Sequence, residues 1–239
     1  MKAPRAIVIA GPGTNRDDDA RHALELAGAD AHIVLADELT ARPRLLDDAR
    51  LAVVAGGFSY ADALGAGRML ALDLTVGLGD KLRGFVAEGR PVIGICNGFQ
   101  VLTRTRLLPG ALGHNANGRF DCRWVSLEPQ RSACVWTKGL EDPIHCPIAH
   151  GEGRYVHPDP ESLGEGGQVA LRYRSTNPNG SVADIAGVSD PSGLVLGLMP
   201  HPENHIVVRQ HPRFARGGGG PEHLGLRIFE QGVRYARES

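Results

Sequence analysis

A cysteine between two glycines is the clearest candidate for chemistry in this sequence. Cys96 stands in the run Gly94-Ile95-Cys96-Asn97-Gly98, between an apolar segment typical of a strand and a segment typical of a helix. The form glycine–x–nucleophile–x–glycine is typical of a nucleophile elbow, because the sharp turn leaves little room for flanking side chains. The positive end of the following helix favours a thiolate. The alternative is a buried structural cysteine at a strand end.

A candidate base follows another apolar run near the C-terminal end. His201 and Glu203 come just after residues 194–199 and are separated by Pro202. Proline keeps the residue before it extended, and residues i and i+2 of an extended segment point to the same side. We therefore expect His201 and Glu203 to hydrogen-bond each other, with His201 as the base for Cys96 and Glu203 as its orienting group.

Other chemistries are possible for the same segment. His201 and His205 have the H-x-x-x-H spacing of some zinc sites, but Pro202 disfavours the helix that this spacing needs and no third ligand is spaced nearby. The H-x-E pattern of zinc deaminases lacks its P-C-x-x-C partner. We therefore predict no metal, and a solvated turn without function is the remaining alternative.

A third glycine turn could stabilise a developing negative charge. Gly56 and Gly57 end a separate apolar run, where a bare backbone can approach a substrate carbonyl closely. The backbone N–H groups of Gly57 and Asn97 are the candidate oxyanion donors. A plain glycine turn is the alternative.

Alternating strand and helix patterns would position these residues. The sequence predicts an α/β fold with a central, mostly parallel sheet flanked by helices and with added short antiparallel strands. Because the carboxyl ends of parallel strands lie at one edge, Cys96 and His201 are expected to meet there. The whole chain, 1–239, is expected to form a single domain. Strands are predicted at 6–10, 31–35, 51–55, 91–95, 123–127, 133–136, 169–173, 182–185 and 194–199, and helices at 16–27, 61–87, 97–106 and the C-terminus.

Composition narrows the classes of function. The net charge is −1 and aromatic residues make up only 5%, which argues against a nucleic-acid partner. The apolar runs are too short for a membrane span, and four cysteines without a C-x-x-C pair suit the reducing cytoplasm. The chain has no phosphate-binding loop, so an ATP-dependent step would belong to a partner. Glycine is abundant, with 32 residues, which indicates many turns.

Several separated motifs together carry a family resemblance. The sequence resembles class I glutamine amidotransferases of the Cys-His-Glu type and, within them, the glutaminase subunits of phosphoribosylformylglycinamidine synthase. It departs from the family pattern at Ala61, where glycine is expected. The motifs are Gly94–Gln100, Met199–Glu203, Gly56–Tyr60, Cys122–Val125, Ile148–Arg154 and Asn177–Ser181.

The resemblance implies a flavodoxin-like core and a glutaminase function. Cys96 would attack the side-chain amide of L-glutamine, His201 would pass the proton to ammonia, and water would hydrolyse the thioester. The family delivers ammonia to a large ATP-dependent synthase subunit, which makes formylglycinamidine ribonucleotide in de novo purine biosynthesis, and a small subunit helps assembly. No cofactor is implied on this chain, whereas ATP and Mg are implied on the synthase subunit. The implied glutamine-binding residues are Ser59, Gln100, Asn179, Gly180 and Ser181.

Two other functions compete with this one. A stand-alone cysteine hydrolase of γ-glutamyl bonds would use the same three residues without a partner. An inactive scaffold subunit would not need them, so the presence of Cys96, His201 and Glu203 together argues against it.

Overall fold

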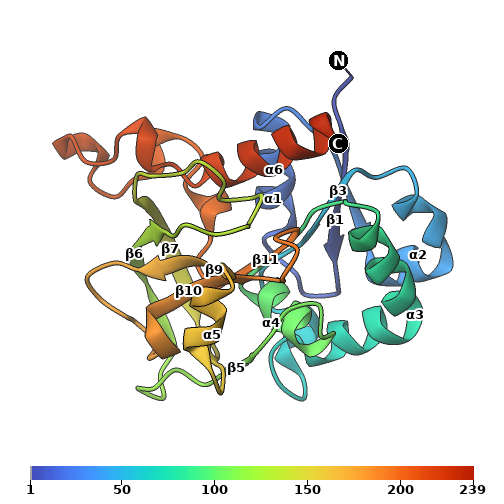
Figure 1. Cartoon of the computed structure of the whole chain (residues 1–239), viewed down its shortest axis with the longest axis horizontal. Coiled ribbons are helices and arrows are strands. Elements are labelled where there is room, and N and C mark those ends of the chain that lie inside the picture. The colour runs from blue at the N-terminus through green and yellow to red at the C-terminus, as the bar shows by residue number, and fades with distance from the viewer. Residues whose placement is uncertain (1) are drawn as a thin grey trace.

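The fold is built on one large mixed sheet, seen in a computed structural model that describes residues 2–239. The nine strands lie in the order β2-β1-β3-β4-β11-β10-β9-β6-β7 (Figure 1), and β5 (Ala111–Gly113) pairs separately with β8 (Arg154–Val156). Strands β1 to β4 and β11 run parallel, whereas the remaining pairs are antiparallel. The predicted α/β class and mostly parallel centre are confirmed.

The parallel half forms from short, almost entirely apolar strands. β1 (Arg5–Ala10), β3 (Leu51–Val54), β4 (Val92–Ile95) and β11 (Val195–Leu198) are buried along nearly their whole length, and β2 (Asp30–Leu35) is the half-exposed edge. Such strands need cover on both faces. Because β11 pairs directly with β4, the residues that follow these two strands are brought to one edge.

Helices cover both faces of the parallel half (Figure 1). On one face α1 (Asp17–Leu26) contacts α6 (Leu226–Glu238), and on the other α3 (Arg68–Ala87) packs against α4 (Asn97–Arg104), with α2 (Ala36–Ala41) beside α3. The sheet order reverses direction at β1, and right-handed crossovers on either side of that strand therefore place helices on opposite faces. The segment that leads into β1 lies beside the end of α6 (Figure 1), where Lys2 and Arg237 line the same cavity.

The antiparallel half corrects several expected elements. β6 (Asp121–Pro129) and β9 (Val169–Tyr173) occur where strands were predicted. Residues 133–136 instead form turns that bury Trp136. The predicted strand 182–185 is wrong except at Ile185, because residues 182–184 form a 3-10 turn and β10 (Ile185–Ser189) begins after it. β7 (Ile144–His150) and α5 (Pro160–Glu165) were not predicted. His145 and Pro147 interrupt the apolar pattern of β7, yet its alternate residues are buried because β6 pairs with it along seven positions.

The predicted helix 61–87 is also shorter than expected. α3 begins only at Arg68, and Ser59–Asp62 form a 3-10 turn in which Tyr60, Ala61 and Asp62 all have positive φ. Left-handed backbone is disfavoured for residues other than glycine, so the surrounding structure must hold this turn.

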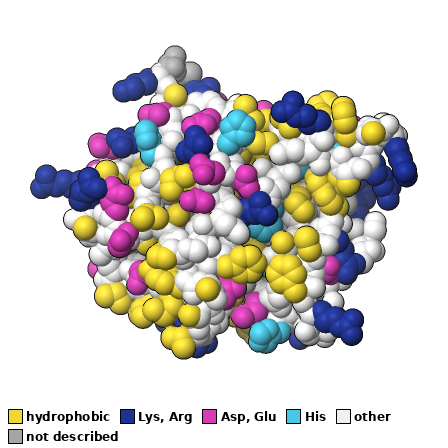
Figure 2. Space-filling view, turned by 180° about the vertical axis from the view of Figure 1, so that it is seen from behind, with side chains coloured by type: hydrophobic (Ala, Val, Ile, Leu, Met, Phe, Trp, Pro, Cys, Tyr) yellow, Lys and Arg dark blue, Asp and Glu magenta, His cyan; other side chains and the backbone are white. Residues whose placement is uncertain are grey.

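The surface mixes charges of both signs on the face shown in Figure 2, with hydrophobic side chains gathered at its lower left, on the side of α3. Leu72 and Val76 of α3 are among the exposed hydrophobic residues. Within residues 2–239, no helix combines the length and the apolar character that a membrane span requires.

Candidate active site

Cys96 occupies a strained turn between β4 and α4. Its φ is 50° and its ψ is −103°, values that a non-glycine residue adopts only when the surrounding structure enforces them. The Cys96 backbone N–H donates to the carbonyl of Leu198 in β11, and the carbonyl of Cys96 accepts from Gln100 in the first turn of α4. The strand on one side and the helix on the other therefore hold the sulfur at the carboxyl edge of the sheet.

The two glycines of the elbow are required by close backbone contacts. A Cβ on Gly94 would lie 2.6 Å from the carbonyl oxygen of Gly98, and one on Gly98 would overlap the carbonyl of Val54 in β3. The first turn of α4 thus rests directly on the backbone of the neighbouring strand. Side chains at either position would displace the helix that carries Cys96.

His201 and Glu203 form a buried pair beside Cys96. The His201 Nδ1–H donates to Glu203 Oε1 at 2.6 Å, and the His201 backbone N–H donates to the carbonyl of Pro147. Glu203 lies in a 3-10 turn rather than in the extended segment that Pro202 suggested. Burial lowers the pKa of His201, but the Glu203 carboxylate and Cys96 outweigh it and raise the pKa to about 10. His201 is therefore positively charged as an imidazolium. Its Nδ1 is used by Glu203, so its Nε2 is the nitrogen that can exchange a proton with Cys96 or its substrate.

The other buried cysteines lack such surroundings. Burial raises the pKa of the Cys134 thiol to about 11, and burial together with the Glu203 carboxylate raises that of Cys146. Both stay as thiols at neutral pH and are poor nucleophiles. Cys96 instead lies at a helix N-terminus, and its Sγ–H donates to the carbonyl of Ala149 at 3.9 Å.

A cavity of about 220 Å³ opens beside Cys96. Cys96 and Gly57 lie on its wall, with Gln100 from α4 and residues 149–152 at the end of β7. Phe58 and Phe120, whose ring centroids are 6.3 Å apart, also line it and remain partly exposed. The complete lining is Gly57, Phe58, Asp62, Ala66, Cys96, Gln100, His114, Phe120, Ala149, His150, Gly151 and Glu152.

Gly57 and Asn97 lie on either side of the elbow. Gly57 has a φ of 125° and forms a β-bridge with Thr14, and a Cβ on it would lie 2.6 Å from the backbone nitrogen of Asn15. Asn97 is the first residue of α4, where a backbone N–H has no acceptor within the helix. Their predicted role as oxyanion donors stays a prediction.

Ser59 and Gln100 belong to a buried network behind the cavity. The Ser59 hydroxyl donates to Asn97 Oδ1 at 2.6 Å, and Asn97 Nδ2 donates to Gln100 Oε1 at 3.0 Å. Gln100 Nε2 in turn donates to the carbonyl of Glu152 at 2.6 Å. Gln100 lines the cavity, whereas Ser59 supports it through Asn97.

Asn179, Gly180 and Ser181 lie away from the cavity lining. Asn179 Nδ2 donates to the carbonyl of Gly153 at 2.8 Å, and the Ser181 hydroxyl donates to Asn179 Oδ1 and accepts from the Tyr155 backbone N–H. Gly180 turns the loop with a φ of 76°. These bonds hold the segment that follows β7, so the loop supports the cavity from behind. Its direct contact with glutamine stays a prediction.

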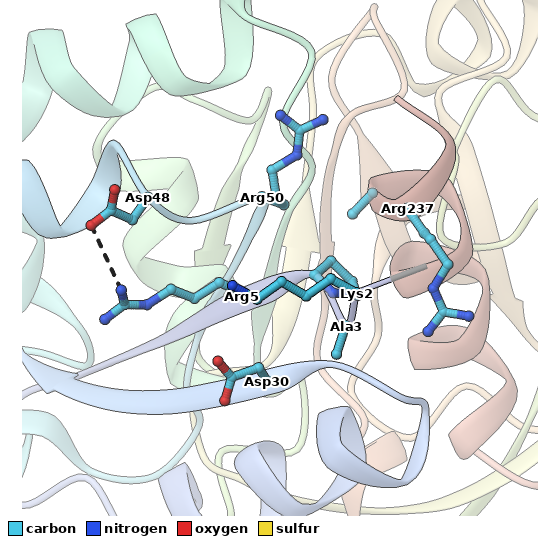
Figure 3. Close-up of a pocket in the computed structure, with 9 residues that line it drawn as sticks. Lys2, Ala3, Arg5, Asp30, Asp48, Arg50 and Arg237 are labelled. Carbon is cyan, nitrogen blue, oxygen red and sulfur yellow. Dashed lines mark ion pairs between the residues drawn. The ribbon is translucent and has the colours of Figure 1, made fainter.

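A larger cavity, of about 740 Å³, lies at the opposite edge of the sheet. It surrounds the beginnings of β1, β2 and β3, and its lining includes Arg5, Asp30, Asp48, Arg50 and Arg237 (Figure 3). Arg5 pairs with Asp48 at 3.6 Å. This cavity lies at the beginnings of the strands, whereas Cys96 follows the end of β4.

Sequence reasoning missed Asp62 and Glu152 as members of the cavity wall. His150, which stood out only as part of a family motif, lines it too and is 3% exposed. The patterns that could have indicated them are the motif 148–154 and the polar turn after Gly57. Neither pattern shows by itself that its side chains reach Cys96.

A cysteine elbow beside a His–Glu pair at the carboxyl edge of a mostly parallel sheet is the arrangement of an amide-cleaving α/β enzyme with a cysteine nucleophile. A family model described as a CobB/CobQ-like glutamine amidotransferase domain matches residues 3–236. The chain therefore belongs to the glutamine amidotransferase family, and its relatives there include phosphoribosylformylglycinamidine synthase subunits named PurQ.

The similarity to these relatives extends along the chain. The PurQ subunit of Treponema denticola is 48% identical over 97% of this chain and 98% of its own length. That of Thermus thermophilus is 44% identical over 84% of this chain and 90% of its own. A chain in the structure of PurLQS from Thermotoga maritima matches with a TM-score of 0.81 at 38% identity, covering 98% of this chain and 99% of that one.

Proposed function

We propose that this chain is the glutaminase subunit of a phosphoribosylformylglycinamidine synthase. It hydrolyses L-glutamine to glutamate and ammonia, and an ATP-dependent synthase subunit uses the ammonia to make formylglycinamidine ribonucleotide in de novo purine biosynthesis. The observation that carries this proposal is the placement of Cys96 between the His201–Glu203 pair and a small cavity. The 48% identity to a PurQ subunit supports the choice of synthase.

The proposed reaction uses Cys96, His201 and Glu203 in two steps. The Cys96 sulfur attacks the side-chain amide carbon of glutamine, His201 Nε2 protonates the amide nitrogen, and the C–N bond breaks to release ammonia. A water then attacks the glutamyl thioester and gives a proton to His201, and the C–S bond breaks to release glutamate. Glu203 keeps the imidazole in one orientation and stabilises its positive charge, as its 2.6 Å hydrogen bond allows.

The remaining predicted residues receive supporting roles. The backbone N–H groups of Gly57 and Asn97 stabilise the oxyanion of each tetrahedral intermediate. Gln100 contacts glutamine from the cavity wall, and Ser59 holds Asn97 in place. The loop of Asn179, Gly180 and Ser181 acts on glutamine through the segment after β7 that it supports.

The chain acts within a complex. The large synthase subunit supplies the sites for ATP and Mg, and this chain needs no cofactor for thioester chemistry at Cys96. A small assembly subunit completes the complex, without a nucleic acid or a membrane, in the cytoplasm. Residues 1–239 form one amidotransferase domain, which the single nine-stranded sheet over residues 5–198 supports.

Replacement of the nucleophile tests this function in the complex reconstituted with the synthase subunit. Cys96→Ser removes the sulfur nucleophile and should abolish glutamine hydrolysis and glutamine-dependent synthesis. Synthesis from added ammonium chloride should continue, because it needs only the synthase subunit. The measurements are glutamate release and formylglycinamidine ribonucleotide formation with either nitrogen source.

A matched cysteine variant controls for the loss of a thiol elsewhere. Cys122 is exposed, so Cys122→Ser should keep both activities. Persistent glutamine hydrolysis by Cys96→Ser would show that the nucleophile lies elsewhere. Rapid turnover of γ-glutamyl peptides by the isolated chain, unchanged by the synthase subunit, would favour a stand-alone hydrolase.

A further inference from the structure

The cavity beside Cys96 carries an unbalanced negative charge. Asp62 and Glu152 both line it, and within residues 2–239 no basic side chain lies within 4.0 Å of either carboxylate. The lining residues that the structure describes include neither lysine nor arginine. Burial and the Glu152 charge raise the pKa of Asp62. Two carboxylates that share a small cavity repel each other unless a cation is placed between them.

Asp62, through its carboxylate, and Glu152, through its backbone carbonyl, are tied to the residues that surround the nucleophile. Asp62 Oδ1 accepts from Asn97 Nδ2 at 3.4 Å, and the Glu152 carbonyl accepts from Gln100 Nε2 at 2.6 Å. Asp62 has a left-handed conformation, with a φ of 53°, in a turn where Tyr60 and Ala61 also have positive φ. These contacts keep Asp62 and Glu152 on the wall of the cavity beside Cys96.

An unpartnered histidine nitrogen on the same wall also indicates a missing donor. His150 is 3% exposed, and its Nδ1–H donates to Asn115 Oδ1 at 3.0 Å, because that oxygen also accepts from the Gly153 backbone N–H while Asn115 Nδ2 donates elsewhere. Nε2 is then a bare acceptor, and it is buried without a hydrogen-bond partner. Burial and the His201 charge lower the pKa of His150 to about 4, so the ring is neutral at physiological pH.

Two carboxylates without a basic partner and one buried ring nitrogen without a donor call for a ligand that supplies N–H groups and positive charge. Glutamine has such a group in its α-ammonium, which lies at the far end of the side chain from the amide that Cys96 attacks. We propose that Asp62 and Glu152 form the subsite that binds the α-ammonium group of glutamine, with His150 Nε2 as an additional acceptor for substrate N–H. The site thus selects amides of α-amino acids and rejects amides that lack this cation. This inference rests on the proposed glutaminase function.

Two isosteric variants test the subsite in the complex reconstituted with the synthase subunit. Asp62→Asn and Glu152→Gln remove one negative charge each, and asparagine tolerates left-handed backbone as well as aspartate does. The substrates are L-glutamine and glutaramate, which has the same amide and carboxylate but no amino group. Each variant should raise KM for glutamine by about tenfold or more, the effect of losing one charged hydrogen bond, with kcat little changed.

The preference for glutamine over glutaramate shows whether a variant has lost binding of the ammonium group or has a damaged active site. The wild type should prefer glutamine over glutaramate by about a hundredfold or more in kcat/KM, and each variant should narrow this ratio without impairing glutaramate hydrolysis. Glu141→Gln removes an exposed carboxylate outside the cavity and should keep the wild-type ratio. The rate of Cys96 alkylation by iodoacetamide should be equal in all of these proteins, because this reagent has no ammonium group.

The outcomes distinguish this inference from the proposed function. Unchanged KM for glutamine in both variants would overturn the subsite, as would equal losses for glutamine and glutaramate. Glutamine hydrolysis that is absent from the wild-type complex, or that survives Cys96→Ser, would instead overturn the glutaminase function itself.

Discussion

At the scale of single residues, the site depends on opposite charges held away from water. His201 and Glu203 are 3% and 1% exposed and are joined by a short hydrogen bond. A buried ion pair gains little overall stability, but removal of one partner leaves the other charge uncompensated. The main role of Glu203 is therefore to keep His201 charged and oriented beside Cys96, and the pair adds little to the stability of the fold.

Glu203→Gln should expose this dependence. The amide keeps the shape of the side chain but not its charge, so the pKa of His201 should fall from about 10. We expect kcat for glutamine hydrolysis to fall by roughly 10²–10⁴, the range for a lost orienting carboxylate or acid–base step. NMR titration of the His201 ring and steady-state glutaminase assays of the complex are the measurements. A variant with an unchanged His201 titration and near-wild-type kcat would contradict this role.

At the scale of secondary structure, the position of Cys96 depends on how closely α4 approaches β3. The contact is made through the backbone of Gly98, where any side chain would overlap Val54. The helix can therefore start immediately after the elbow, with its N-terminal end beside the sulfur. The same closeness buries Asn97 and Gln100, which connect the elbow to the cavity wall.

Gly98→Ala should consequently damage both stability and activity. The new methyl group must push α4 away from β3, which we expect to cost about 1–3 kcal/mol in the free energy of unfolding and to reduce glutaminase activity. Gly84→Ala in α3 is the matched control, because a Cβ there meets no atom within 4 Å. That variant should gain about 0.5–1 kcal/mol and keep its activity. Urea unfolding of both proteins measures the difference, and equal stabilities would show that α4 adjusts without cost.

At the scale of the whole molecule, a histidine of β7 lies together with three histidines of residues 205–223. The rings of His145 and His223 stack with centroids 4.5 Å apart, and His205 and His211 lie near Trp124. Burial lowers the pKa of His145 to about 4, with further lowering by the neighbouring histidines and Arg174. This cluster joins β7 to residues 205–223, which follow the catalytic pair.

The stability of the protein should accordingly be greatest near pH 6.5. His145 and His150 have folded-state pKa values of about 4, below the ordinary value of 6.5, so the unfolded chain binds protons first and stability is lost as the pH falls from about 6.5 toward 4. His201 has a raised pKa of about 10, so its contribution is complete below about 6.5 and is lost as the pH rises toward 10.

Thermal unfolding between pH 4 and pH 10 measures the loss of stability on the acid side and on the alkaline side. His145→Gln should reduce the loss of stability at acid pH, because it removes a group with a lowered pKa. Glu203→Gln should reduce the loss at alkaline pH, because it removes the carboxylate that raises the pKa of His201. Parallel curves for wild type and variants would show that these groups do not determine the pH dependence.

Local patterns were enough to predict much of the fold and the elements of the site. The apolar runs before Cys96 and His201 became β4 and β11, and their pairing brings the two residues to one edge. The run 133–136 was misjudged as a strand, because β-prone residues also form a buried turn when Trp136 has a core to fill. Residues 182–184 were also misjudged, since they form a 3-10 turn and the strand begins at Ile185. β7 was missed because its histidine and proline obscure the alternation that its pairing with β6 creates.

The sequence by itself determined the nucleophile elbow, the His–Glu pair and the α/β class, since each depends on residues close together in the chain or on periodicity. Only the tertiary structure decided which residues face the reacting sulfur. Asp62, His150 and Glu152 meet there because the turn after β3 and the end of β7 both cross the carboxyl edge of the sheet. Contacts between such distant segments depend on strand order and chain path, and no local pattern records them.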